Sequence, residues 1–264
     1  MASSPSPPPR FLLSSQRVWN TLRESLRDAV GLVLPTWCVV CGTENRSVCG
    51  ACRETIVYRE NRRSIPVVDR AGAVRELWVC SAVAYEGNVR RILLAVKEGR
   101  SDASGALAPL LRRVLGDELA RLYRSGASAG RVIRVVPMPS TARSERLRGF
   151  RPVELLVRSG SLCVFGFLEG AWRQDASRRV RLKRWLRVRR RRRKNQVGLS
   201  RTERQRNVDE TLVASYQCAT NFIVIVDDVI TTGSSLRESY RALSEKGGIV
   251  LGAVTLAHTP RHPV

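Results

Sequence analysis

The sequence predicts an α/β fold: a parallel sheet with helices on both faces, preceded by a small four-cysteine knuckle. Residues 222–226 are a fully apolar run typical of a buried strand, residues 234–246 have the pattern of a helix, and residues 249–256 form a second apolar run. Strand, helix and strand at this spacing indicate a βαβ unit, in which the two strands are parallel. Two C-x₂-C pairs within residues 38–52 indicate the knuckle.

Earlier parts of the chain supply further elements. The short apolar segments 77–85 and 132–136 predict strands, and helices are expected at 103–122 and 154–157. A helix is also expected at 88–96, where the apolar residues recur at helical spacing: Val89, Ile92, Leu93 and Val96. Residues 1–34 are expected to be a disordered Pro/Ser tail followed by an amphipathic helix, because Val18, Leu22, Leu26 and Val30 are four residues apart.

The composition favours a folded, strongly basic protein. Of 264 residues, 43% are hydrophobic, which argues against global disorder. There are 46 basic and 23 acidic residues, which give a net charge of +23. Residues 178–194 alone hold twelve basic side chains and no acidic one. Such a charge attracts nucleic acid, anionic membranes or phosphorylated small molecules, and the alternative is a solvated basic face.

The cysteines and the apolar runs indicate a cytoplasmic protein. Four of the seven cysteines are clustered, while Cys80, Cys163 and Cys218 stand alone in apolar surroundings, which is typical of buried thiols in a reducing compartment. No run approaches the eighteen or more apolar residues of a transmembrane segment. The first residues lack the apolar core of a signal peptide.

The most informative segment is 222–236, FIVIVDDVITTGSSL. Polar residues begin where the expected strand ends, at the edge of an α/β sheet that binds ligands. Asp227 and Asp228 can accept hydrogen bonds from neighbouring ribose hydroxyls. The residues that lead into the helix can surround a phosphate with N–H groups, hydroxyls and the helix N-terminus, and they are Thr231, Thr232, Gly233, Ser234 and Ser235.

This segment resembles the phosphoribosyl-pyrophosphate signature of type I phosphoribosyltransferases at every position. The resemblance implies that Asp227 and Asp228 are the catalytic, ribose-binding pair and that 231–235 hold the 5′-phosphate. A wider stretch, 32–257, is similar to the ComF proteins, named for competence for DNA uptake. That similarity includes the four-cysteine knuckle, the segment with Lys97, the Pro-x-Pro turn, Arg148-Gly149-Phe150, and Gln196 to Ser200.

The Pro-x-Pro turn follows an expected strand, so it too should lie at the carboxyl edge of the sheet. The resemblance implies a pyrophosphate site there, formed by Pro139, Ser140, Arg143 and Arg148, with Arg146 adding positive charge. It also implies that 194–204 are the loop that closes over the substrate. The chain departs from the ComF pattern at Arg151-Pro152, where the family usually has Asn-Gln.

The knuckle has the spacing of a metal site. Each C-x₂-C pair can turn two thiolates toward one ion, so Cys38, Cys41, Cys49 and Cys52 predict a closed, structural Zn²⁺ site. Reduced thiols without metal, or an iron–sulfur site, are the alternatives. The expected organisation is therefore a tail and helix at 1–34, a zinc knuckle at 35–65, and a phosphoribosyltransferase-like domain at 75–260 with a basic loop at 178–200.

The basic loop leaves two functions open. Trp185 among arginines suits single-stranded nucleic acid, with contacts expected from Arg184, Arg189, Arg191 and Arg193. A solvated loop is the alternative. The chain is then either a phosphoribosyltransferase that uses phosphoribosyl pyrophosphate and Mg²⁺ with an unidentified acceptor, or a non-catalytic accessory protein that binds single-stranded DNA and a related nucleotide. A homodimer, or a protein of the DNA-uptake machinery, is the expected protein partner.

Overall fold

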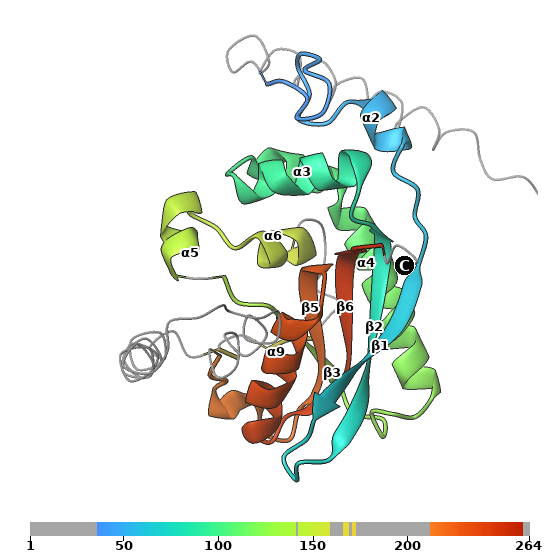
Figure 1. Cartoon of the computed structure of the whole chain (residues 1–264), viewed down its shortest axis with the longest axis vertical. Helices are drawn as coiled ribbons and strands as arrows, with labels where there is room; N and C mark the ends of the chain where they lie inside the picture. Colours follow the sequence, from blue (N-terminus) through green and yellow to red (C-terminus); the bar gives the residue numbers. More distant parts are fainter. Residues whose placement is uncertain (1–35, 141, 159–165, 169–170, 173–211, 261–264) are drawn as a thin grey trace, which may run out of the picture.

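A six-stranded sheet forms the centre of the structure, a computed structural model that describes residues 36–140, 142–158, 166–168, 171–172 and 212–260. The strands in chain order are β1 (Asn61–Val68), β2 (Val74–Ala84), β3 (Ile133–Pro137), β4 (Gly166–Phe167), β5 (Phe222–Ile230) and β6 (Ile249–His258). Their order in the sheet is β1-β2-β6-β5-β3-β4 (Figure 1). The edge strand β1 is antiparallel to β2, and the other described pairings are parallel.

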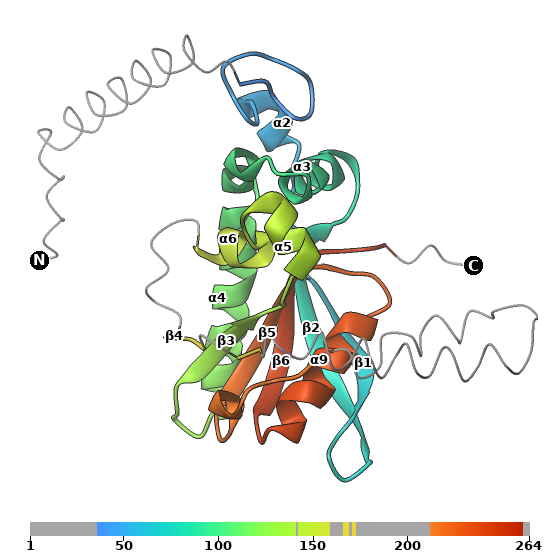
Figure 2. The same cartoon turned by 90° about the vertical axis from the view of Figure 1, so that its left-hand side faces the viewer.

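Helices lie on both faces of this sheet (Figure 2). The helical segments in chain order are α2 (Gly50–Glu54), α3 (Gly87–Lys97), η1 (Ser101–Ala106), α4 (Ala108–Arg124), α5 (Ala142–Arg148), α6 (Pro152–Arg158), η2 (Tyr216–Cys218) and α9 (Ser234–Glu245). A mixed α/β fold with a mostly parallel sheet is thus confirmed. Within the described ranges, no helix combines the length and the apolar character needed to cross a membrane.

Alternating side chains of β5 build the two cores. Val224 and Val226 pack in the cluster that includes α3, α4 and α6, whereas Ile223 and Ile225 pack in the cluster that includes α9. Because both faces of the strand are buried, its sequence is a continuous apolar run rather than an alternating one. The pattern that predicted a central strand therefore reports burial on both sides.

The sheet begins earlier than the sequence analysis expected. Strand β1 starts at Asn61, inside the range assigned to the knuckle and before the domain start expected at residue 75. Only Ile65 and Val67 of this strand are buried, and Pro66 occupies an edge position where its missing N–H is tolerated. The first half of this strand is polar and its apolar half contains a proline, so its sequence has no clear strand pattern and did not reveal it.

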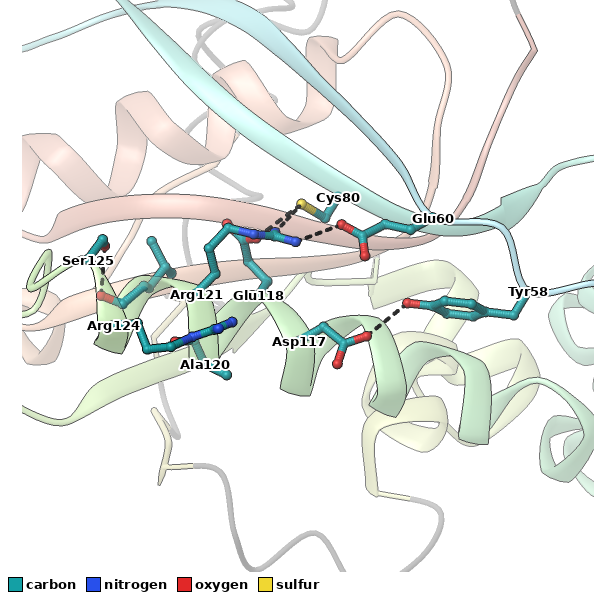
Figure 3. Close-up of polar contacts among 10 residues, drawn as sticks. Tyr58, Glu60, Cys80, Asp117, Glu118, Ala120, Arg121, Arg124 and Ser125 are labelled. Carbon is teal, nitrogen blue, oxygen red and sulfur yellow. Dashed lines mark hydrogen bonds and ion pairs between the residues drawn. The ribbon is translucent and has the colours of Figure 1, made fainter.

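A buried polar network joins α4 to the sheet (Figure 3). Cys80 Sγ donates to Glu118 Oε2 at 3.1 Å, and Glu118 is only 1% exposed. Arg121 pairs with Glu118 and, through Nη2, with Glu60 Oε1 at 2.9 Å. Cys80 is buried, as the sequence predicted, but a buried carboxylate lies on one side of its thiol. Burial, together with Glu118, raises the pKa of Cys80 to about 12, so its thiol stays protonated.

Replacing Glu118 by alanine should cost about 2–4 kcal/mol of unfolding free energy, because the change leaves the thiol and Arg121 without their buried partner. Glu60→Ala is the matched control, since it removes the more exposed partner of the same arginine and should cost less than about 1 kcal/mol. Urea unfolding measures both values. Equal losses for the two variants would contradict this interpretation of the network.

Candidate functional site

Two adjacent aspartates lie near the carboxyl end of β5. Asp227 is paired in register with Thr255 of β6, and the ladder continues to Ile230 opposite His258. The sequence analysis ended this strand before the aspartates, and that boundary is wrong because β6 also runs on to His258 and supplies main-chain partners. The acid pair therefore lies on a strand, with a more fixed backbone than a loop would give it.

A lysine from α3 contacts the acid pair. Lys97 is the last residue of α3, and its Nζ lies 2.8 Å from Asp228 Oδ2. The lysine side chain is 34% exposed and that of Asp228 only 13%, so the ion pair is partly shielded from water. Sequence reasoning noted Lys97 as part of the ComF resemblance but did not place it in the site. A single sequence contains no pattern that predicts the proximity of the end of α3 to β5.

The two aspartates differ in their electrostatic environment. Burial, and then the charge of Asp228, raises the pKa of Asp227 to about 7. The main-chain N–H of Asp228 donates to Asp227 Oδ1 at 2.8 Å, and this bond and the charge of Lys97 act in the opposite direction. Asp227 is therefore the member of the pair that gains a proton near neutral pH.

The loop after β5 is fastened through its carbonyl oxygens. Arg63 of β1 donates from Nη2 to the carbonyls of Ile230 at 3.2 Å and Thr231 at 3.1 Å. Arg237 of α9 donates from Nη1 to the carbonyl of Thr232 at 3.1 Å. In the part of the chain that the structure describes, the N–H groups of Thr232 and Gly233 donate no main-chain hydrogen bond. The loop thus combines occupied carbonyls with N–H groups that can receive an anion.

Gly233 gives this loop its shape. Its φ of +79° is in the left-handed region, and it directly precedes the first residue of α9. A Cβ at this position would lie 3.0 Å from Ile65 Cδ1 of β1, so a side chain would be strained and crowded. Beyond it, Ser234 is half-buried and Ser235 is exposed at the N-terminus of α9, where an anion is favoured. The structure therefore brings residues 231–235 next to the acid pair.

The turn after β3 lies at the same edge of the sheet. The N–H of Met138 donates to the carbonyl of Val226, the residue before Asp227, at 2.7 Å. Pro139 and Ser140 come directly after Met138, and both are half-buried. Arg148, the last residue of α5, donates from Nη1 to the carbonyl of Lys97 at 3.2 Å. Arg143 lies in the same helix, and its side chain lies outside the described atoms.

Arg151, where the chain departs from the ComF pattern, has a structural contact. Its Nε lies 2.9 Å from Glu145 Oε1 of α5, and its Nη1 lies 3.2 Å from Glu154 Oε1 of α6. Pro152 then begins α6, a position where a missing N–H costs nothing. Arg151 therefore links the short helices α5 and α6 beside the candidate site.

The four cysteines of the knuckle come together as the sequence predicted. The sulfurs of Cys38, Cys41, Cys49 and Cys52 all lie within 4.8 Å of one another, and Cys41 and Cys49 are 3.6 Å apart. Zinc–sulfur bonds of about 2.3 Å put the corners of a tetrahedron about 3.8 Å apart. The cluster therefore has the size and the donor chemistry to bind a metal ion.

Hydrogen bonds favour the thiolate form at two of the four cysteines of the knuckle. The N–H of Cys49 donates to Cys38 Sγ at 3.4 Å. Burial opposes ionisation of Cys38, but main-chain hydrogen bonds, led by that of Cys49, outweigh it and lower the pKa to about 6. The pKa of Cys41 is also lowered, first by hydrogen bonding to Thr43. The pKa of Cys52 is instead raised to about 12, first by hydrogen bonding with Cys49, so Cys38 and Cys41 are the thiols that ionise more readily.

The knuckle is docked on the corner formed by α3 and η1, and both views show it beside α3 at one end of the molecule (Figures 1 and 2). Arg100 donates from Nη2 to the carbonyl of Trp37 at 3.1 Å, and Ser47 Oγ donates to the carbonyl of Asp102 at 3.1 Å. Asn88 Nδ2 donates to Thr55 Oγ1 at 2.8 Å. The knuckle therefore contacts the segments that flank Lys97 on both sides.

Several expected features lie outside the described residues. They are the helix at 15–33, Cys163, the closing loop at 194–204, and the proposed nucleic-acid contacts Arg184, Trp185, Arg189, Arg191 and Arg193. Comparison of the whole chain with protein-family models and with curated proteins finds no match.

The raised pKa of Asp227 predicts a pH-dependent stability. An unfolded aspartate titrates near pH 4, so its contribution is fully present below about pH 4 and is lost as the pH rises to about 7. Asp227→Asn should therefore raise the unfolding free energy at pH 8 by about 1–3 kcal/mol and change it little at pH 4.

Chemical unfolding at the two pH values measures this effect. Glu76→Gln, which makes the same chemical change at an exposed position of β2, is the control and should give no such gain. If Asp227→Asn has the same effect at pH 4 and pH 8, the carboxyl does not titrate in this range and the interpretation is wrong.

Proposed function

We propose that this protein binds phosphoribosyl pyrophosphate at the carboxyl edge of its sheet and transfers the phosphoribosyl group to an acceptor, as a ComF-like type I phosphoribosyltransferase. The observation that carries the proposal is the placement of Asp227 and Asp228 on the strand that leads directly into the loop 231–235. Two carboxylates suit two neighbouring hydroxyls, and a helix N-terminus preceded by Gly233 suits a phosphate. A phosphorylated ribose carries both groups a few bonds apart.

The leaving group would lie toward the turn after β3. Pro139 and Ser140 follow the strand that neighbours β5, and Arg148 reaches the same region through the carbonyl of Lys97. In the transfer, the bond from ribose C1 to pyrophosphate breaks, the electron pair leaves with pyrophosphate, and an acceptor nucleophile forms the new bond to C1. Guanidinium contacts to the departing oxygens strengthen as negative charge develops there. Mg²⁺ that accompanies the ligand would supply positive charge to offset the negative charge that develops on the departing pyrophosphate.

The knuckle is proposed to hold a structural Zn²⁺ ion. The four thiols lie within 4.8 Å of one another, so they would supply all four ligands of a tetrahedral ion and leave no position for a substrate. The contacts of Arg100 and Ser47 with neighbouring carbonyls extend its effect to α3 and η1. A metal at this position would stabilise the corner of the fold that carries Lys97.

Calorimetry with phosphoribosyl pyrophosphate and Mg²⁺ tests the ligand. Asp228→Asn keeps the shape of the side chain but removes a charged hydrogen-bond acceptor, so affinity should fall about tenfold to a hundredfold. Glu76→Gln, which makes the same chemical change on the exposed part of β2, should leave affinity unchanged. Unchanged binding by Asp228→Asn would remove the acid pair from the site.

The zinc proposal predicts about one zinc ion per chain by native mass spectrometry. Cys49→Ser should lose the ion and increase hydrogen exchange in the knuckle and in η1. Cys218→Ser, at a buried cysteine elsewhere in the fold, should keep it. Purified wild-type protein with no metal and four free thiols in the knuckle would refute the proposal.

A second candidate function, binding of single-stranded nucleic acid, is favoured by the twelve basic residues and Trp185 within residues 178–194. The charge exceeds what one pyrophosphate requires. An accessory protein of DNA uptake would use this segment for the nucleic-acid backbone and bases, and would use the phosphoribosyl site to bind a nucleotide without transfer.

The salt dependence of binding distinguishes this candidate. Each neutralised phosphate contributes about −0.7 to the slope of log affinity against log salt for single strands. Serine at Arg189, Arg191 and Arg193 should flatten the slope by about 2 if each of these residues neutralises one phosphate. Serine at Arg90 and Arg91, two exposed arginines of α3, is the control and should not change it. An unchanged slope in the first variant would show that the basic segment is not the contact surface.

A further inference from the structure

Lys97 is the feature of the site that the phosphoribosyl signature does not explain. It comes from α3, far from β5 in the sequence, and its ammonium lies 2.8 Å from Asp228 Oδ2. Within the described residues, the charged groups found at the acid pair are Lys97 of α3 and, through the Lys97 carbonyl, Arg148 of α5. Arg63 of β1 and His258 of β6 lie at the end of β5, beyond the pair.

The fold holds Lys97 at this position from several sides. Val89, Ile92, Leu93 and Val96 are buried in the core cluster that α3 shares with α4 and α6. Arg148 fixes the carbonyl of Lys97 at 3.2 Å, and Arg100, three residues further on, is tied to Trp37 of the knuckle. A lysine that served only to solubilise the surface would not need this anchoring. The position of the ammonium is therefore a property of the fold.

The ammonium has a defined electrostatic effect on both acids. The side chain of Asp228 is 13% exposed, and the ion pair with Lys97 partly replaces the hydration that it loses on burial. Asp227 has no cation of its own among the described contacts, and the charge of Lys97 is among the influences that lower its pKa. Without Lys97, two adjacent carboxylates would compete for one proton, and the site would lose an acceptor near neutral pH.

We propose that Lys97 is a positioning residue of the phosphoribosyl site, whose ammonium orients Asp228 and offsets the negative charge of the acid pair so that both carboxylates accept hydrogen bonds from the ribose hydroxyls. This inference rests on the proposed function, because it assigns the acid pair to ribose. Lys97 acts through the aspartates and does not itself contact the pyrophosphate. The effect of Lys97 should therefore depend on pH and not on the leaving group.

The experiment compares two probes, phosphoribosyl pyrophosphate with Mg²⁺ and ribose 5-phosphate, by calorimetry from pH 6 to pH 9. Lys97→Met should weaken both by the same factor, about tenfold near pH 6.5, and the deficit should shrink above pH 8 as Asp227 ionises. Lys97→Arg, which keeps the charge, should restore most of the affinity. Lys246→Met, a lysine that lies over the ring of Tyr216, is the control and should change nothing.

Three results would overturn the inference: a loss for phosphoribosyl pyrophosphate alone, a loss that is equal at every pH, or no loss. The first would make Lys97 a pyrophosphate contact instead. Failure of the proposed function is distinguishable, because the wild-type protein would then bind neither probe. In that case NMR titration of the Asp227 carboxyl carbon still decides: the midpoint should rise in Lys97→Met relative to wild type, and an unchanged midpoint would refute the role of Lys97.

Discussion

The position of β5 between β3 and β6 determines where the candidate ligand contacts lie. Because both neighbours are parallel to β5, all three strands end at one edge of the sheet. The acid pair and the loop 231–235 therefore lie at the same edge as the Pro-x-Pro turn, which comes from a separate part of the chain. β5 can occupy this central position because its apolar run suits burial on both faces. The location of the site at the end of β5 therefore follows from that run.

That position also creates an electrostatic problem. Two carboxylates at the partly buried end of a strand repel each other and lose hydration. The helix α3 places the ammonium of Lys97 beside Asp228 and so compensates part of this charge. Asp227 keeps a raised pKa of about 7. The knuckle packs against the same corner, through Arg100 and Ser47. The four-cysteine cluster and the acid pair are therefore connected by one short helix, α3.

Local patterns predicted a large part of this arrangement. The strands β5 and β6, the helix α9 between them and the four-cysteine cluster follow from residue spacing alone, because each depends on contacts within a short segment. The edge strand β1 was not predicted, because Ile65 and Val67 are its only buried apolar residues. The contact between Lys97 and Asp228 could not be predicted from the sequence, because it depends on how α3 packs in the fold. The assignment of the site to phosphoribosyl chemistry came from resemblance, and it remains a prediction.

A crystal structure of the protein with phosphoribosyl pyrophosphate and Mg²⁺ is the most direct test of the central claim. The account predicts the 5′-phosphate on the N–H groups of the loop 231–235 and the two ribose hydroxyls on Asp227 and Asp228. Lys97 should still contact Asp228 in that complex. A ligand bound elsewhere, or a ligand whose phosphate avoids this loop while the aspartates face only water, would contradict it.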